Sequence, residues 1–191
     1  MRAISLRLAI GVLTVALGPL SWAQNNILDP RSMAPFVPTP PKIVERMLRL
    51  ADVTSRDTVF DLGSGDGRIV ITAAQQFGAR AVGVELDAGL VLKTRQRIKE
   101  LKMEDRAEIV EGNLLDVDLS SASVVTLYLL TSSNLQLKPK LEESLKPGTR
   151  VVSHDFQIQG WTPISTETLR GDAREHKIFV YEIGKHSQPA P

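Results

Sequence analysis

The chain has 191 residues, enough for one domain of ordinary size and too few for two. Its 42% hydrophobic and 24% charged residues are typical of a globular protein, and its 23 basic and 22 acidic residues nearly cancel. A near-neutral domain has no long-range field to gather nucleic acid, which weakens a tRNA or rRNA substrate without excluding it. The absence of cysteine excludes disulfides, thiolate metal sites and a cysteine nucleophile. His154, His176 and His186 lack ligand spacing, so we expect no metal site.

Residues 1–23 have the pattern of a secretory signal peptide. Arg2 and Arg7 give a basic start, residues 8–20 form an apolar run, and Ser21 and Ala23 are small residues suited to a cleavage site. We therefore predict export to the periplasm or beyond, with residues 24–34 as a flexible tether. The apolar run would span about 20 Å as a helix, short of roughly 30 Å of hydrocarbon. An uncleaved membrane anchor is the alternative, and an organelle-targeting presequence is a weaker one.

Strand and helix patterns alternate from residue 41 onwards. Pro41 suits the first position of a helix that runs to about Leu50. Further helices are predicted over residues 66–77, 89–101 and 134–145, and strands over residues 58–62, 81–85, 108–110, 124–129, 150–153, 164–169 and 178–183. This alternation predicts an α/β, Rossmann-like doubly wound fold with a mostly parallel seven-stranded sheet. The last two strands have no helix between them and predict an antiparallel edge. The domain would cover residues 35–184, followed by a disordered tail over residues 185–191.

A glycine-rich turn after the first predicted strand is the most informative motif. Asp61 ends the strand, and Gly63, Gly65 and Gly67 follow at alternate positions around Ser64. Such a turn bends sharply and lets a ligand touch the backbone at a helix N-terminus. The dinucleotide fingerprint G-x-G-x-x-G requires a glycine where this chain has Arg68. An acid before the loop suits a cationic ligand, so we predict S-adenosylmethionine, with Asp61 facing its amino group. The alternative is an ordinary tight turn.

Two later positions complete the predicted cofactor site. Glu85 ends the second strand and can accept both ribose hydroxyls, each charge-assisted bond contributing roughly 1.5–3 kcal/mol. Its alternative role is to cap the next helix, for which Asp87 is the better candidate. Asn113, with Leu114 beside it, follows the third strand, where an amide suits the adenine edge; a simple turn asparagine is the competing reading.

The site of the group that accepts the methyl of S-adenosylmethionine is expected at the end of the fourth strand. Thr126 and Tyr128 lie there, and we predict that they form the pocket wall, although Tyr128 as a core residue is an equal alternative. The proline-rich residues 35–40 offer Phe36 and Thr39 as a lid over the cofactor, or form only a linker. His154 is predicted to be a satisfied structural histidine.

Several runs resemble a narrower family. Residues 35–40, 61–74, 124–130 and 145–156, with Asn134 and residues 138–141, resemble class I methyltransferases related to the ATP synthase c-subunit lysine N-methyltransferase. Ser64 departs from a cysteine often found there, and Asn113 departs from an acidic residue common in class I enzymes. The resemblance implies the class I methyltransferase fold and a lysine acceptor in a protein; a protein near or within a membrane is one candidate.

The predicted function is therefore S-adenosylmethionine-dependent methylation of a protein lysine. An exported, non-catalytic cofactor- or nucleoside-binding module and a methyltransferase of small molecules remain alternatives. An aminopropyltransferase shares the fold, but its paired acids for a polyamine are not identifiable in the sequence.

Overall fold

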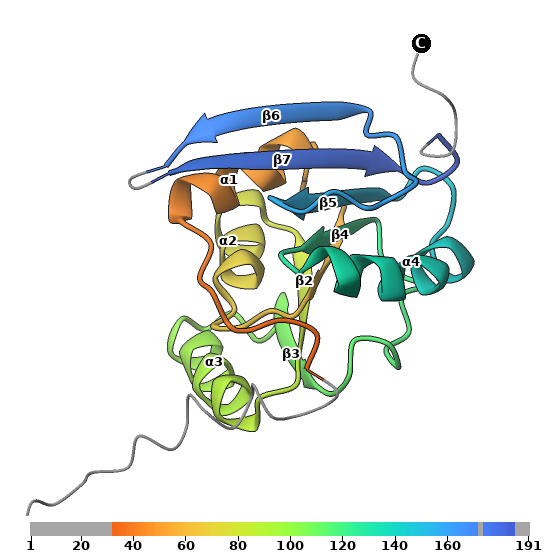
Figure 1. Ribbon diagram of the computed structural model, residues 1–191. Helices are drawn as coiled ribbons and strands as arrows, with labels where there is room; N and C mark the ends of the chain where they lie inside the picture. The colour runs from red at the N-terminus through yellow and green to blue at the C-terminus, as the bar shows by residue number, and fades with distance from the viewer. Residues whose placement is uncertain (1–31, 172–173, 186–191) are drawn as a thin grey trace, which may run out of the picture.

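The computed structural model describes residues 32–171 and 174–185. The predicted signal peptide, tether residues 24–31 and tail residues 186–191 lie outside them. Seven strands form one sheet in the order β3-β2-β1-β4-β5-β7-β6 (Figure 1). They are β1 (Thr58–Leu62), β2 (Arg80–Glu85), β3 (Ala107–Glu111), β4 (Val124–Leu127), β5 (Arg150–His154), β6 (Ser165–Arg170) and β7 (Glu175–Glu182). The first five run parallel, and β7 pairs antiparallel with both β5 and β6. The predicted fold class is confirmed.

Within the described residues, four helices connect and cover the strands: α1 (Pro41–Leu50), α2 (Arg68–Phe77), α3 (Ala88–Glu100) and α4 (Thr131–Ser144). Helix α2 begins two residues later than predicted because Gly67 caps it in the left-handed conformation, with φ 70°. Helix α4 begins three residues earlier, since the Asn134 amide already bonds the Leu130 carbonyl at 2.9 Å. Among the described residues, the helices are all too short or too polar to cross a membrane.

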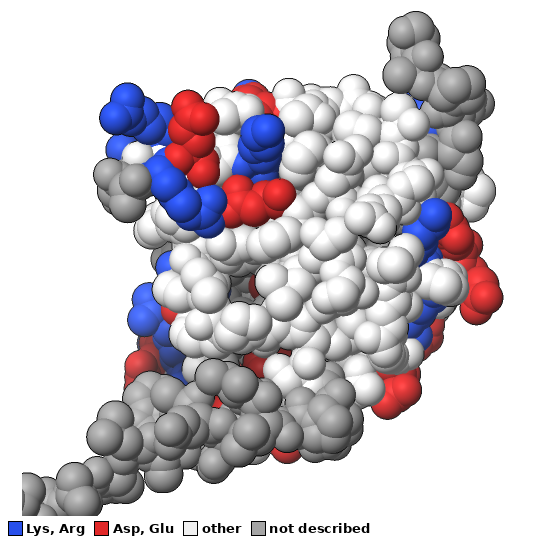
Figure 2. Space-filling model, viewed as in Figure 1, with Lys and Arg blue, Asp and Glu red and all other residues white. Residues whose placement is uncertain are grey.

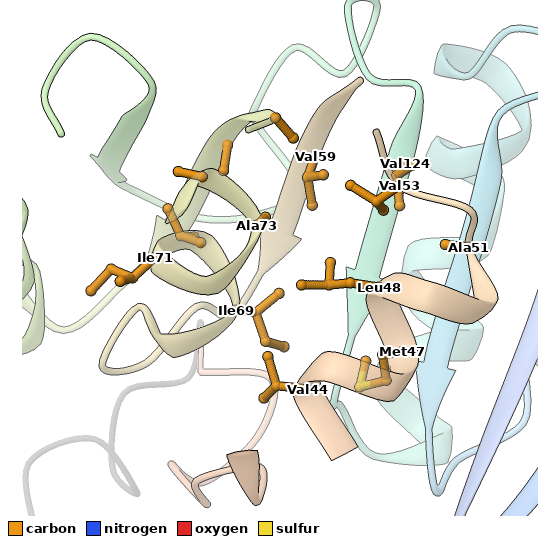
Figure 3. Packing of buried hydrophobic residues seen from close by; sticks show 14 of the residues in the cluster. Val44, Met47, Leu48, Ala51, Val53, Val59, Ile69, Ile71, Ala73 and Val124 are labelled. Carbon is orange, nitrogen blue, oxygen red and sulfur yellow. The ribbon is translucent and has the colours of Figure 1, made fainter. Parts of the chain in front are cut away.

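Apolar side chains pack on both faces of the sheet. On one face α1, α2 and α3 cover the strands, and Met47 and Leu48 of α1 are completely buried. Figure 3 shows Val44 and Leu48 of α1 beside Ile69 of α2, with Val59 and Val124 of the sheet behind them. The other face is covered by α4, through Leu137 and Leu141, and by the loop that carries Trp161. Burial on both faces explains the nearly continuous apolar runs of the central strands.

The strand order places a crevice at the carboxyl ends of β1 and β4. The chain moves outward from β1 through β2 to β3 and then returns to the other side of β1 for β4. Connections therefore leave β1 and β4 in opposite directions, and ligands of doubly wound sheets bind in the resulting gap. Asp61 near the end of β1 is in register with Gly83 and Thr126 on the flanking strands.

Candidate cofactor and acceptor site

A hollow that is partly open to solvent lies at this crevice. Five segments line it: residues 32–39, the glycine loop, the end of β2, the turn after β3, and Tyr128 with Leu129. Figure 2 shows this hollow near the middle of a wide uncharged area, with charged side chains gathered where β6 leads into β7. Residues 32–34 belong to the predicted tether, yet they contribute to this lining.

The glycine loop requires glycine for two different reasons. Gly63, Gly65 and Gly67 all have positive φ, at 81°, 56° and 70°. A Cβ on Gly65 would come within 2.5 Å of the Phe36 ring, which lies directly on the loop. A Cβ on Gly67 would come within 2.2 Å of Thr94 on α3. Gly65 therefore permits close approach from the pocket side, and Gly67 permits packing of the loop against a helix.

Asp61 is a buried carboxyl on the floor of the pocket, only 3% exposed. Burial raises its pKa to about 7, the carboxylates of Glu85 and Asp66 add to the rise, and the Thr126 hydroxyl opposes it. That hydroxyl donates to Asp61 Oδ1 at 2.7 Å. Ionised Asp61 would gain from a cation in the pocket, because a positive charge compensates for lost hydration.

Thr126 itself is completely buried behind Asp61 and is not among the residues that line the pocket. This position does not bring it to an acceptor, as our prediction of a pocket-wall role required. Its bond to Asp61 makes it a positioning residue for that carboxylate.

Glu85 joins the end of β2 to the glycine loop. Its Oε2 accepts the Gly65 amide at 2.7 Å, and its Oε1 accepts the amides of Leu86 and Asp87 at 2.8 and 2.9 Å. A carboxylate offers about four lone-pair sites, so acceptor capacity remains on the pocket side. The predicted cap of α3 is Asp87, whose side chain accepts the Leu90 amide at 2.8 Å, and this prediction is confirmed.

Asn113 and Leu114 form the wall after β3. The Asn113 side-chain oxygen accepts the Leu115 amide at 3.0 Å, as in an Asx turn. The turn engages the oxygen, which leaves the amide NH₂ as the group suited to an adenine nitrogen. Leu114 is 8% exposed and supplies apolar surface beside it.

Residues 32–39 cover the pocket, and hydrogen bonds hold both ends of this segment. The Ser133 hydroxyl at the start of α4 donates to the Met33 carbonyl. The Thr39 carbonyl accepts from Arg68 at 2.7 Å, and Arg68 also pairs with Asp66 of the loop. Arg68 thus joins the cover to the glycine loop, a role that our sequence analysis missed. The spacing Asp66-x-Arg68 was the available signal.

Tyr128 lies one residue beyond β4 and lines the pocket. Its ring packs against the buried His154 ring, with 3.9 Å between centroids. His154 Nδ1 is 3.3 Å from the Thr39 hydroxyl, and its Nε2 is 2.8 Å from His176 Nδ1. Burial lowers the pKa of His154 to about 4, so the ring is neutral near pH 7. This agrees with the satisfied structural histidine that we predicted.

Arg174 and Asp155 lie beside Tyr128 and were not among the site residues that we predicted. Arg174 donates to the Tyr128 hydroxyl at 2.9 Å and to Asp155 Oδ2 at 2.6 Å. His154, Asp155 and His176 also bring potential metal ligands within 4.8 Å of one another, which their sequence spacing did not suggest. The two histidines bond each other and Asp155 pairs with Arg174, so these groups already have partners.

The pocket suits an adenosyl group that carries a sulfonium and an amino acid. The Ser64 hydroxyl is buried at the pocket and, among the described residues, has no hydrogen-bond partner. Asp61 and Glu85 supply negative charge, Gly65 leaves room for close approach, and Asn113 offers an amide. A pyrophosphate would instead be repelled by the two carboxylates.

Comparison with known proteins agrees with this chemistry. Residues 61–165 match the ANTKMT methyltransferase domain family. A protein-lysine N-methyltransferase of Saccharolobus islandicus (strain REY15A) is 50% identical over 153 residues, covering 80% of this chain and 95% of the relative. The human lysine N-methyltransferase of the ATP synthase c-subunit is 37% identical over 68% of this chain, which spans only 54% of that protein.

A solved structure from Salinibacter ruber, described as an RNA methyltransferase in complex with S-adenosyl-L-homocysteine, is also similar. It is 47% identical, has a TM-score of 0.72, and the match covers 81% of this chain and 97% of that one. The predicted resemblance, enzyme class and cofactor are confirmed: the chain is an S-adenosylmethionine-dependent methyltransferase.

Proposed function

The chain belongs to the ANTKMT methyltransferase domain family, and we propose that it methylates a lysine side chain of a protein. The similarity that carries this proposal is the 50% identity to a protein-lysine N-methyltransferase along nearly all of that relative's length. The chain also resembles lysine N-methyltransferases named for the ATP synthase c-subunit and for the adenine nucleotide translocase. A protein with an accessible lysine is therefore the proposed partner.

The cofactor-binding residues in this proposal are those whose pocket positions suit its chemistry. Asp61 would face the amino group, Glu85 the ribose hydroxyls, and Asn113 with Leu114 the adenine. The backbone of Gly63 and Gly65 would approach the cofactor closely, Ser64 would use its free hydroxyl, and Thr39 with Phe36 would close over it. Gly67, which we also predicted to bind the cofactor, packs against Thr94 and is not among the residues that line the pocket, so its role is to shape the loop. Support comes from pocket lining, burial and the Ser64 oxygen, which has no partner among the described residues.

The chemistry requires orientation and desolvation more than a base. Bound S-adenosylmethionine supplies a methyl group on a positively charged sulfur, and the neutral sulfur is the leaving group. The lysine first loses a proton to solvent, which near pH 7 costs about 4–5 kcal/mol from a pKa near 10.4. The half-buried Tyr128 ring, which lines the pocket and packs against the buried, neutral His154 ring, reduces this cost by disfavouring the charged amine. The Tyr128 hydroxyl would orient the amine nitrogen for in-line attack.

A lysine acceptor also agrees with the surface around the pocket. Uncharged side chains prevail on the face that Figure 2 shows, and Phe36 and Val37 at the pocket are 47% and 53% exposed. A phosphate backbone needs clustered Lys and Arg, and the chain as a whole is nearly neutral. The exposed apolar side chains of Phe36 and Val37 fit a protein acceptor in or near a membrane, which we include in the proposal.

We further propose that residues 1–23 direct export and are cleaved after Ala23, or else remain as a membrane anchor. The support is the basic start, apolar run and small residues of that segment. Residues 1–30 fused to a reporter active only outside the cytosol test this. Activity confined to the cytosol would refute export, and an uncleaved membrane-bound fusion would favour the anchor.

The test of function is incubation of residues 24–191 with methyl-labelled cofactor and with membrane and soluble fractions of the organism. Mass spectrometry should find added methyl mass on lysine in a protein. Gly65→Arg, which fills the cofactor side of the loop, is the inactive control. Label found only on RNA, lipid or a small metabolite would show that the proposed acceptor class is wrong, and no label at all would favour the binding-module alternative.

A further inference from the structure

Asp155 occupies an unusual backbone position beside the proposed acceptor pocket. It follows β5 directly and has a left-handed backbone, with φ 60°. Its amide donates to the Lys177 carbonyl at 2.7 Å, while its Oδ1 accepts the Lys177 amide at 2.9 Å. Left-handed residues other than glycine cost free energy and cluster at functional sites. The Lys177 amide thus holds Oδ1, and Oδ2 lies beside Arg174, 3.2 Å from His154 Nε2 and 3.5 Å from His176 Nδ1.

A single cationic nitrogen lies between two oxygens of this site. Arg174 Nη2 donates both to Asp155 Oδ2 at 2.6 Å and to the Tyr128 hydroxyl at 2.9 Å. The Asp155 side chain is only 14% exposed, whereas that of Arg174 is 51% exposed and extends from the β6–β7 hairpin. The buried partner is thus fixed by the fold, and the cation is a surface side chain that can withdraw.

The groups around Arg174 Nη2 are of the kinds that bind a lysine ammonium. An ammonium has three N–H donors and no acceptor, so it requires oxygen atoms and tolerates aromatic rings. The carboxylate, the phenol oxygen and the Tyr128 ring supply these, and the ring of Phe156 lies 6.2 Å from that of Tyr128 between centroids. Tyr128 also lines the cofactor pocket, so a cation held at its hydroxyl stands next to that pocket.

We propose that Asp155 binds the acceptor ammonium through Oδ2, and that Arg174 occupies this place when no acceptor is bound. The inference rests on the proposed lysine acceptor. It assigns the two carboxylates separate cations: Asp61 serves the cofactor on the pocket floor, and Asp155 serves the acceptor at the edge beyond Tyr128. Arg174 acts as an internal competitor, because the same oxygens cannot fully satisfy two cations.

Asp155 has the properties of a binding group and not of a base. Burial raises its pKa, but the bonds from Arg174 and the Lys177 amide outweigh burial, and the net direction is down. The carboxylate therefore stays ionised. Its charge favours the protonated amine, so Asp155 serves binding and does not lower the cost of removing the proton, which falls to the Tyr128 wall. The proton leaves to water after binding, so removal of the Asp155 charge affects acceptor affinity first.

Binding of n-butylamine, which copies the lysine stem and amine, tests the inference without turnover. The protein is loaded with S-adenosylhomocysteine, and binding near pH 7 is followed by NMR titration. Arg174→Gln removes the competitor from an exposed side chain and should tighten binding on the order of tenfold, the equivalent of about one charge-assisted bond. Asp155→Asn in the Arg174→Gln background should abolish this gain. Asn tolerates left-handed backbone and keeps an oxygen for the Lys177 amide, so the fold should persist.

n-Butanol is the matched neutral probe and should bind all variants alike, as should S-adenosylhomocysteine. Unchanged or weaker butylamine binding by Arg174→Gln would overturn the inference, as would a double variant that binds as tightly as Arg174→Gln. Lysine methylation by the unaltered protein is scored separately. If it occurs while Arg174→Gln gains no affinity, this inference fails and the proposed function stands; if no lysine is methylated, the proposed function fails whatever the amine does.

Discussion

Cofactor affinity should depend on pH through Asp61. In the ligand-free protein its pKa is raised to about 7, first by burial and then by Glu85 and Asp66. A cofactor carrying a positive amino group binds the ionised form preferentially, so binding releases a proton at acidic pH. With a pKa of about 7, about one-tenth of Asp61 is ionised at pH 6 and about nine-tenths at pH 8. The affinity should therefore rise about tenfold between these values, or about 1.4 kcal/mol.

Isothermal calorimetry with S-adenosylhomocysteine at both pH values measures the change. Buffers of different ionisation enthalpy report the released proton directly, and close to one proton is expected at pH 6. Asp61→Asn is the matched control, because it keeps the acceptor for Thr126 and removes the charge. Its affinity should be low and independent of pH. Equal affinity of the unaltered protein at both pH values, or an undiminished pH dependence in Asp61→Asn, would refute the reasoning.

The same shift has the opposite sign for folding without ligand. Because the folded pKa lies above the unfolded value of 3.8, protonated Asp61 contributes stability that is present below about pH 4 and lost as pH rises through about 7. His154 acts in the opposite direction, because its folded pKa is lowered from 6.5 to about 4, so the comparison is made between variants. Between pH 6 and pH 8 the thermal midpoint of the unaltered ligand-free protein should fall more, or rise less, than that of Asp61→Asn.

Substitutions at three residues test the remaining assignments. Gly65→Arg should abolish cofactor binding in calorimetry while circular dichroism reports a folded domain, because a side chain there meets Phe36 on the pocket side; retained binding would exclude close approach at Gly65. Glu85→Ala should weaken binding by roughly 1.5–3 kcal/mol or more, since it also frees the Gly65 amide, whereas Glu85→Gln should lose less. Normal binding by Glu85→Ala would leave Glu85 a purely structural residue. Tyr128→Phe should lower turnover while cofactor affinity stays unchanged, and equal turnover would remove the hydroxyl from the mechanism.

The cofactor half of the site was predictable because its signals are local. The loop, its preceding acid and the following helix occupy consecutive positions, and the alternating strands fix which ends meet. The predicted bounds of β4 and α4 were less accurate. The apolar run at the end of this strand continues towards the helix, and no glycine or proline marks where one element ends and the next begins. Tyr128 and Leu129 were therefore predicted within the strand and lie in the loop after it.

The acceptor half depends on pairing that the sequence does not encode locally. His154 pairs with Ile178 across the antiparallel β5–β7 ladder. That register brings His176, two residues earlier and on the same side of β7, against His154, although 22 residues separate them. Arg174 reaches Asp155 by the same route. A register shift of one residue would move the β7 side chains to the opposite face of the sheet. The spacing of these residues in the sequence therefore did not indicate a cluster.

The two carboxylates at this crevice illustrate how one fold separates two cation sites. Asp61 receives one hydroxyl bond in a buried position near other acids, so its pKa rises to about 7, and near neutral pH it is fully charged only when a cation is bound. Asp155 receives a backbone amide and a guanidinium near the surface, so its pKa falls and its charge is permanent. Groups whose environments move their pKa values apart take different roles. The charge of Asp155 at the rim attracts a cationic side chain before it binds. The charge of Asp61 on the floor is unfavourable in free energy until the cationic ligand is bound. Neutral His154 and Tyr128 lie beside the rim site, where the amine must lose its proton before it reacts.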